Sequence, residues 1–160
     1  MNAIRWAVIG VMALLLAGCS DTSPGTASGS LHAVQLDESG LIAAVGSPLV
    51  DEYSLDDGRG LNFRAENEPA FKLEFRAGRT NISWTEYSDE PAKFGSLNAE
   101  NVKWAGQVFT YALGKEATAK IMSGVNGDKP LKFEHLGHEV RLMPSGGGIQ
   151  ALVTIALMKP

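Results

Sequence analysis

The chain has 160 residues and a formal net charge of −4 at pH 7, with 44% hydrophobic and 20% charged residues. This balance is typical of a globular protein, and its negative sign argues against nucleic acid or anionic lipid as partners attracted by the overall field. Cys19 is the single cysteine, so an internal disulfide and a thiolate metal site are excluded.

Residues 1–18 have the layout of an export signal. Arg5 gives the segment a positive start, an apolar run follows over residues 6–16, and the small residues Ala17 and Gly18 end it. The run is about half as long as the roughly 20 residues that a helix needs to cross a bilayer. We therefore expect a cleaved signal peptide and no permanent membrane span.

The segment Leu16-Ala17-Gly18-Cys19 resembles the lipobox of bacterial lipoproteins. This resemblance implies that Cys19 is acylated on its sulfur, becomes the N-terminus of the mature protein and is then acylated on its amine. Two or more acyl chains hold a protein stably on a membrane. Ser20 stands where inner-membrane lipoproteins of enteric bacteria usually carry an aspartate. The resemblance thus implies a periplasm-facing anchor in the outer membrane, with the inner membrane or the cell surface as alternatives.

The mature chain divides into a linker and one domain. Residues 19–30 carry no large apolar side chain after the cysteine, so nothing in them offsets the entropy of ordering, and we expect a flexible linker. Residues 31–160 carry apolar side chains throughout, with no second segment of this kind. We therefore expect a single β-rich periplasmic domain over residues 31–160.

The first clear strand pattern lies over residues 71–76, which alternate strictly between apolar and charged side chains. Such alternation is typical of a strand with one buried face. Residues 77–79 interrupt the pattern, and it resumes from Thr80 to Trp84. The sequence therefore predicts a β-hairpin over residues 71–87 with a short turn that contains Gly78.

The middle of the chain permits two interpretations. Residues 104–113 are rich in β-branched and aromatic types, which favours a strand, whereas the residues from Ser96 onward could open a short helix within 96–106. A further strand is expected over residues 118–122. It would lead into a hairpin turn at Asn126-Gly127.

The C-terminal third predicts a second hairpin, with Leu136-Gly137 as its two-residue turn, and a long final strand. One face of the hairpin would carry Leu131, Phe133, His135, His138, Val140 and Leu142. Residues 149–158 are nearly all apolar and suit a central strand buried on both faces. Together these short strands predict a mainly β fold, either an antiparallel sandwich or a barrel-like meander.

The sequence carries little catalytic chemistry. It contains neither a nucleophile elbow nor a phosphate-binding loop, and it predicts no cofactor. His135 and His138 would face each other across their turn and could, with Glu134 or Glu139, ligate zinc or copper, which makes a metal-binding lipoprotein the alternative function. A glycan hydrolase is the third hypothesis, and its candidate carboxylates are Asp51, Glu52, Glu86, Asp89 and Glu90.

The function expected first is binding without catalysis. Trp84 and Tyr87 on the 71–87 hairpin are the candidate binding residues, because exposed aromatic side chains are common anchors in recognition surfaces, and the mix of polar and aromatic residues over 85–87 favours exposure there. We therefore expect a lipid-anchored envelope protein that binds or inhibits a protein partner or a small ligand.

Overall fold

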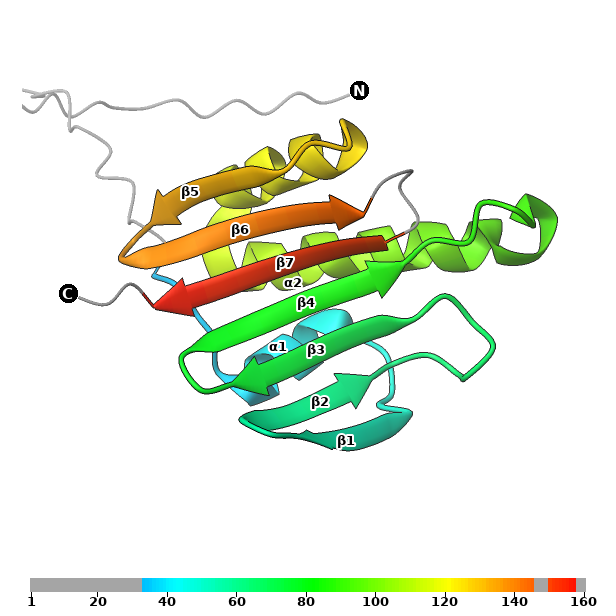
Figure 1. Cartoon of the computed structure of the whole chain (residues 1–160), viewed down its shortest axis with the longest axis horizontal. Coiled ribbons are helices and arrows are strands. Elements are labelled where there is room, and N and C mark those ends of the chain that lie inside the picture. The colour runs from blue at the N-terminus through cyan, green and yellow to red at the C-terminus, as the bar shows by residue number, and fades with distance from the viewer. Residues whose placement is uncertain (1–32, 146–149, 158–160) are drawn as a thin grey trace, which may run out of the picture. The chain divides into compact units, whose positions relative to one another are not determined.

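The computed structural model describes residues 33–145 and 150–157, so the expected signal peptide, Cys19 and the linker lie outside the described residues. Within the described part, seven strands form one antiparallel sheet and two helices pack against it (Figure 1). The elements are, in chain order, α1 (Glu38–Val45), β1 (Asp51–Leu55), β2 (Gly58–Asn62), β3 (Phe71–Arg76), β4 (Arg79–Thr85), α2 (Pro91–Asn126), β5 (Leu131–His135), β6 (His138–Ser145) and β7 (Gln150–Leu157).

The sheet joins two meanders in the order β1-β2-β3-β4-β7-β6-β5. The first four strands follow one another along the chain, the last three do the same, and α2 connects the two groups. β4 pairs with β7, with Ile82 opposite Val153, so the last strand of the described residues lies inside the sheet. The prediction of a mainly β, antiparallel fold is confirmed in its meander form. The helix that the prediction allowed is also present.

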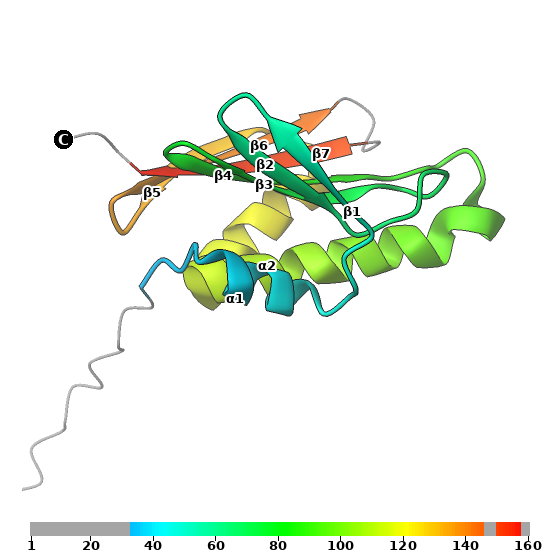
Figure 2. The same cartoon turned by 90° about the horizontal axis from the view of Figure 1, so that it is seen from below.

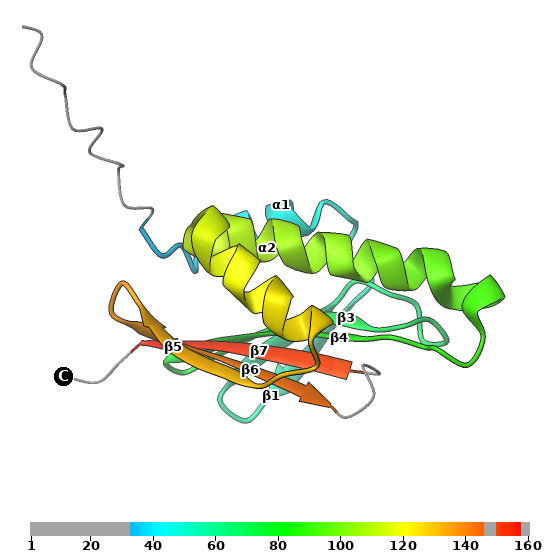
Figure 3. The ribbon, with the colours of Figure 1, turned by 90° about the horizontal axis from the view of Figure 1, so that it is seen from above.

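Both helices lie on the same side of the sheet. Figures 2 and 3 show the molecule from two opposite directions, and in both α1 and α2 form a second layer against one face of the sheet, with no described helix on the other side. We call these two sides the covered face and the open face. The covered face carries Leu61, Phe71, Leu73, Ile82, Trp84, Val140, Leu142, Val153 and Ile155, and the open face carries Tyr53, Lys72, Glu74, Asn81, Lys132, Arg141 and Thr154.

The β3–β4 hairpin forms as the alternation predicts. Phe71 and Leu73 are fully buried, whereas Lys72 and Glu74 between them are only partly covered. The turn places Gly78 at φ +77°, in the left-handed region that glycine adopts without the steric cost of a Cβ atom. Side chains two residues apart in a strand share a face, so the apolar positions come together against the helices.

The core lies between the covered face and α2. Rings from the two layers meet edge to face, with the Phe71 and Trp104 centroids 5.5 Å apart, and Trp84 packs against Phe109 with their centroids 6.1 Å apart. Aromatic pairs in these arrangements stabilise a core beyond the area that they bury. All four side chains belong to one cluster that extends from β2 to β6.

α2 replaces the strands expected over 104–113 and 118–122, so those two predictions are wrong. Its buried positions 101, 104, 105, 108, 109 and 112 recur with the spacing of a helix that has one apolar stripe. Val108 and Phe109 have side chains that also suit strands, but here they fill the space under the sheet, and packing overrides local propensity. The helix possible within 96–106 is confirmed as part of this longer one. No helix of the described residues has the length and apolar character needed to cross a membrane.

Two glycines shape α2. Gly114 has φ +81° and ψ +170°, which interrupts the helix between an N-terminal and a C-terminal segment. At the far end, the backbone N–H of Gly127 donates to the carbonyl of Ser123 at 3.1 Å and closes the helix. Asn126-Gly127 is therefore a helix end, and the hairpin turn predicted there is wrong. Both a hairpin turn and a helix C-terminus favour glycine, so the dipeptide alone does not separate them.

One charged side chain and one amide are buried at the end of the core. Arg64 is 7% exposed, stacks on the Trp104 ring with its Cζ 4.1 Å from the centroid, and donates to Asn101 Oδ1 at 3.0 Å. Asn101 is fully buried and donates from Nδ2 to the Pro69 carbonyl at 3.0 Å and to those of Ala70 and Thr85. Buried polar groups require such partners, so this node joins α2 to the loop before β3 and to the end of β4.

α1 is fixed to α2 by its first turn. Asp37 caps the helix by accepting from the backbone N–H of Gly40 at 2.8 Å, and the Tyr111 hydroxyl of α2 donates to the same carboxylate. A Cβ atom on Gly40 would lie 1.9 Å from that hydroxyl oxygen, so only glycine permits this close approach.

The second hairpin also forms as predicted. Leu136 and Gly137 have φ values of +47° and +80°, as a two-residue turn between antiparallel strands requires, and His135 lies opposite His138. β7 occupies the predicted central position, between β4 and β6. It is not buried on both faces, because its residues alternate between buried and partly exposed from Ala151 to Ala156. The helices cover one side of the sheet only, which explains the difference.

Candidate functional site

A row of hydrogen-bonded side chains crosses the open face from β1 to β7. The Tyr53 hydroxyl donates to Glu74 Oε1 at 3.3 Å, and Asn81 Nδ2 donates to Glu74 Oε2 at 3.0 Å. The Thr154 hydroxyl then donates to Asn81 Oδ1 at 2.9 Å. Glu74, Asn81 and Thr154 are directly opposite one another in neighbouring strands, so the strand register sets the row.

Two arginines extend this row toward the β1–β2 turn. Arg76 donates from Nε to Glu74 at 2.9 Å and from Nη1 to Asp57 at 2.5 Å, so carboxylates hold it on two sides. Arg79 contacts the other oxygen of Asp57 from Nη2 at 3.4 Å, a longer and weaker bond. Arg76 is therefore fixed, whereas Arg79 is 46% exposed and held at one point.

A second charged group lies on the other side of β7. Lys132 Nζ lies 2.8 Å from Glu139 Oε2, and Arg141 donates from Nε to the other oxygen of Glu139. The hydrogen bonds from Lys132 and then Arg141 lower the pKa of the Glu139 carboxyl. Glu139 thus stays ionised at neutral pH, and Lys132 already supplies one positive charge to it.

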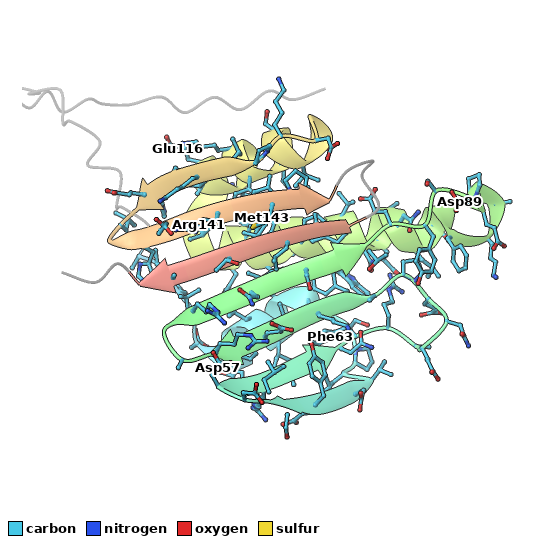
Figure 4. All side chains as sticks on the ribbon, in the orientation of Figure 1. Asp57, Phe63, Asp89, Glu116, Arg141 and Met143 are labelled. Carbon is cyan, nitrogen blue, oxygen red and sulfur yellow. The ribbon has the colours of Figure 1, made fainter. Side chains whose placement is uncertain are left out.

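A hollow of about 500 Å³ lies between these two groups. Figure 4 views the open face and shows Arg141 and Met143 on β6, with Asp57 farther along the sheet. The floor of the hollow is β7, because Thr154 and Ala156 are short while the side chains on the flanking strands are long. The residues that line it are Arg76, Arg79, Asn81, Glu139, Arg141, Met143, Leu152, Thr154 and Ala156.

The polar row has a defined protonation state. Burial raises the pKa of the Glu74 carboxyl, but hydrogen bonds from Asn81 and Arg76 outweigh burial, and the net pKa is lowered. Burial, together with the nearby Glu74 charge, raises the pKa of the Tyr53 hydroxyl to about 12. At neutral pH the row therefore consists of a charged carboxylate and a neutral hydroxyl that donates to it.

The histidine pair lies elsewhere. His135 and His138 are direct partners across the β5–β6 turn, on the covered face, while Glu134 and Glu139 point to the open face. The Nε2 atom of His135 is buried without a hydrogen-bond partner, and the Nδ1 atom of His138 lies 3.1 Å from the Leu136 carbonyl oxygen. Among the described residues, no group of three potential metal ligands comes together.

Of the two predicted aromatic anchors, only Tyr87 reaches the surface. Trp84 is 1% exposed, so its interpretation as an exposed binding residue is wrong. It shares the covered face with Ile82, two residues earlier in β4, because side chains alternate between the two faces of a strand, and this alternation places Trp84 in the core. Tyr87 is 37% exposed and packs against Phe94, with the ring centroids 5.0 Å apart.

The candidate carboxylates for hydrolysis fall into two sets. Asp51 and Glu52 begin β1, and Glu52 is bound by Arg59 at 2.7 Å. Glu86, Asp89 and Glu90 line a smaller hollow of about 230 Å³ at the start of α2, next to Tyr87. Glu52 is thus ion-paired with Arg59, and the five carboxylates are divided between two places in the fold.

Sequence reasoning missed the hollow on the open face. The alternation over 71–76 did place Lys72, Glu74 and Arg76 together on one face. It could not place Arg141 and Thr154 beside Asn81, because that neighbourhood depends on β7 lying between β4 and β6. Strand order is the missing information.

Comparison with family models, curated proteins and solved structures found no match to this chain. The geometry of the open face and the N-terminal sequence are thus the observations from which a function can be argued.

Proposed function

We propose that the protein is a non-catalytic binding module of the bacterial envelope, which binds a partner or ligand on the open face of its sheet. The observation that carries the proposal is the asymmetry of the sheet. The covered face builds the core, whereas the open face presents a hollow lined by three arginines and by Met143, which is 62% exposed. Arginine and methionine are both enriched in recognition surfaces.

The charged groups of the open face suit recognition better than turnover. Glu74 and Glu139 each accept from a basic side chain, and their lowered pKa values keep them ionised at neutral pH. A general acid must hold its proton near the working pH, which these carboxyls do not do. Glu74, together with Asp57, instead fixes the position of Arg76 on a rigid sheet. Binding sites gain affinity from such preorganisation.

We propose further that a lipid on Cys19 holds this module on the periplasmic side of the outer membrane. The lipobox at 16–19 supports the anchor, and Ser20 after the cysteine supports the outer membrane over the inner one. Lipid attachment leaves the folded part accessible to partners near the membrane.

The anchor is tested by fatty-acid labelling. Wild-type protein should incorporate radioactive palmitate, and Cys19→Ala should incorporate none and should stay uncleaved or leave the membrane fraction. Ser20→Asp tests the localisation, because it should shift the labelled protein toward the inner membrane on a sucrose gradient. Label on Cys19→Ala would refute the lipoprotein assignment.

The open face is tested by photo-crosslinking in living cells. A benzophenone side chain at position 143 should give a specific adduct, whereas the same group at position 115, an exposed position on α2, should give none. Adducts from position 115 alone would place the binding surface on the helical layer and contradict the proposal.

A metal site at the β5–β6 turn is the second candidate, because the two histidines face each other and one buried nitrogen lacks a partner. Zinc titration of the mature protein would support it only if binding is stoichiometric, nanomolar and lost in the His135→Ala, His138→Ala double variant. We expect weaker binding, since two histidines supply half of a tetrahedral shell.

A further inference from the structure

We propose that the hollow on the open face binds an anionic amphiphile, a molecule with one phosphate or carboxylate head and one short apolar chain. The inference rests on the proposed function of the open face and names the chemistry of its ligand. Three features of the hollow carry it: its shape, its distribution of charge and its apolar end.

The shape follows from the side chains of three neighbouring strands. Arg79 on β4 and Arg141 on β6 stand on the two sides of β7, where the floor residues Thr154 and Ala156 are short. Neighbouring strands lie about 4.8 Å apart, so the two arginine-bearing strands are separated by about 10 Å. That gap is narrow enough for both guanidinium groups to reach one ligand above β7. The volume of the hollow, about 500 Å³, falls within the range of small-molecule sites.

The charge in the hollow opposes that of the whole chain. The protein carries a net charge of −4, yet three arginines and a single glutamate line this hollow. Asp57 and Glu74, next to it, hold Arg76, and Lys132 offsets the charge of Glu139. These four basic and three acidic side chains leave a net charge of +1, and Arg79 and Arg141 are the two lining arginines that are each held by a single carboxylate.

These two arginines can exchange their present bonds for a ligand at small cost. Their side chains are 46% and 53% exposed, and ion pairs so exposed to solvent contribute little to stability. The hydrogen bond of Arg141 to Glu139 that the structure describes is donated by Nε. Guanidinium groups bind phosphate and carboxylate oxygens through paired N–H donors, so the arginine end of the hollow suits an acidic head group.

The other end of the hollow is apolar. Met143 is 62% exposed and lies directly opposite Leu152, and both line the hollow. From Ala156 to Leu152 the floor is about 14 Å long, since strand residues rise about 3.4 Å each. A thioether side chain adapts to irregular apolar partners. A ligand with its head at Arg79 and Arg141 would thus rest its apolar chain on Met143 and Leu152.

The test uses lipidated full-length mature protein in nanodiscs of neutral phosphatidylcholine, with ¹³C-methyl methionine as the reporter. Three probes are titrated: hexyl phosphate, inorganic phosphate and hexanol. We expect the Met143 methyl resonance, assigned with Met143→Leu, to shift saturably with hexyl phosphate. The dissociation constant for inorganic phosphate should be at least tenfold weaker, and hexanol should cause no saturable shift.

Variants locate the head group. The double variant Arg79→Gln, Arg141→Gln should bind hexyl phosphate at least tenfold more weakly than wild type. The double variant Arg79→Lys, Arg141→Lys should have an intermediate affinity, because lysine keeps the charge and loses the paired donors. Lys115→Gln with Lys129→Gln removes the same charge from exposed positions outside the hollow and should bind as wild type does. Urea unfolding verifies that each variant is folded.

The outcomes separate this inference from the proposed function. If inorganic phosphate binds as tightly as hexyl phosphate, the apolar chain contributes nothing to binding. If hexanol binds as tightly as hexyl phosphate, the anionic head contributes nothing. Either result overturns the inference. If none of the probes shifts Met143 while position 143 still crosslinks a protein in cells, the amphiphile inference fails and the binding function stands. If the probes leave Met143 unchanged and position 143 gives no crosslink, both the amphiphile inference and the proposed binding function are refuted.

Discussion

The two faces of the sheet are made by the same strands and differ in almost every chemical respect. In β3, Phe71 and Leu73 are fully buried on one side, while Lys72 and Glu74 stand on the other. The covered face is held by packing and one buried polar node, and the open face is held by hydrogen bonds and ion pairs at partly exposed side chains. Stability therefore depends on one face, and the other is available for recognition.

This division also explains why the charged network does not compromise the fold. Ion pairs at exposed positions contribute little, so changes among them alter the surface without unfolding the protein. Changes in the core leave cavities that the surrounding side chains fill only in part. Paired substitutions at neighbouring positions measure the contrast directly.

The largest contrast is expected within β3. Leu73→Ala should lower the free energy of unfolding by about 2–5 kcal/mol, because it removes a fully buried side chain and leaves a cavity. Lys72→Ala, one residue away on the open face, should change it by about 0.5 kcal/mol or less. Urea titration of both variants provides the measurement, and equal losses would show that the faces do not differ as described.

A second comparison concerns two amides. Asn101→Ala should cost about 2 kcal/mol, since Arg64 and three backbone carbonyls lose a partner in the covered layer. Asn81→Ala on the open face should cost about 1 kcal/mol, because water can reach the groups that it leaves. Thermal unfolding of the two variants should rank them in this order, and the reverse ranking would contradict the burial of Asn101.

The pH dependence sharpens the description of the open face. Hydrogen bonds from Asn81 and Arg76 lower the pKa of Glu74 in the folded protein below its ordinary value of 4.5, so the stabilisation is present above about that pH and is lost as Glu74 is protonated. Glu74→Gln should cost about 0.5–1 kcal/mol at pH 7 and nothing at pH 2. Stability curves that remain parallel from pH 7 to pH 2 would exclude this coupling.

The same variant has an effect on Tyr53. Burial and the Glu74 charge raise the Tyr53 pKa to about 12, so Glu74→Gln should lower it, while burial keeps it above its usual value of 10. Ultraviolet titration against a Tyr53→Phe control isolates this hydroxyl. Because the folded pKa is the higher one, wild-type stability should fall as the pH rises from 10 to 12.

The smallest effect is expected at Met143. Met143→Ser should change the free energy of unfolding by less than about 0.5 kcal/mol, because the side chain is 62% exposed and contributes little to the core. Guanidinium titration suffices to measure it. A loss comparable to that of Leu73→Ala would assign Met143 to the fold and withdraw it from the binding surface.

The sequence predicted the elements whose signals are local. The alternation at 71–76, the turn residue Gly78 and the Leu136-Gly137 turn each specify their own backbone, and all three hairpin features were found. Residues 104–113 misled because aromatic and β-branched side chains suit a strand as well as the apolar stripe of a covering helix.

The candidate site could not be predicted in the same way. Its polar row joins Asn81 to Thr154, which are 73 positions apart, through a pairing of two strands that α2 and two further strands separate in the sequence. No local pattern states which strand lies beside which. The histidine pair, by contrast, was found correctly as a geometry, because a two-residue turn alone brings His135 to His138.

The position of β7 constrains the order in which the chain acquires its structure. As the ribosome releases the chain from its N-terminus, β1 to β4 are available early and can form hairpins, and β5 and β6 follow. β4 has only β3 as a partner, and β6 only β5, until residues 150–157 are made, because β7 joins the two meanders. Completion of the sheet therefore waits for residues 150–157, after every other strand that the structure describes has been made.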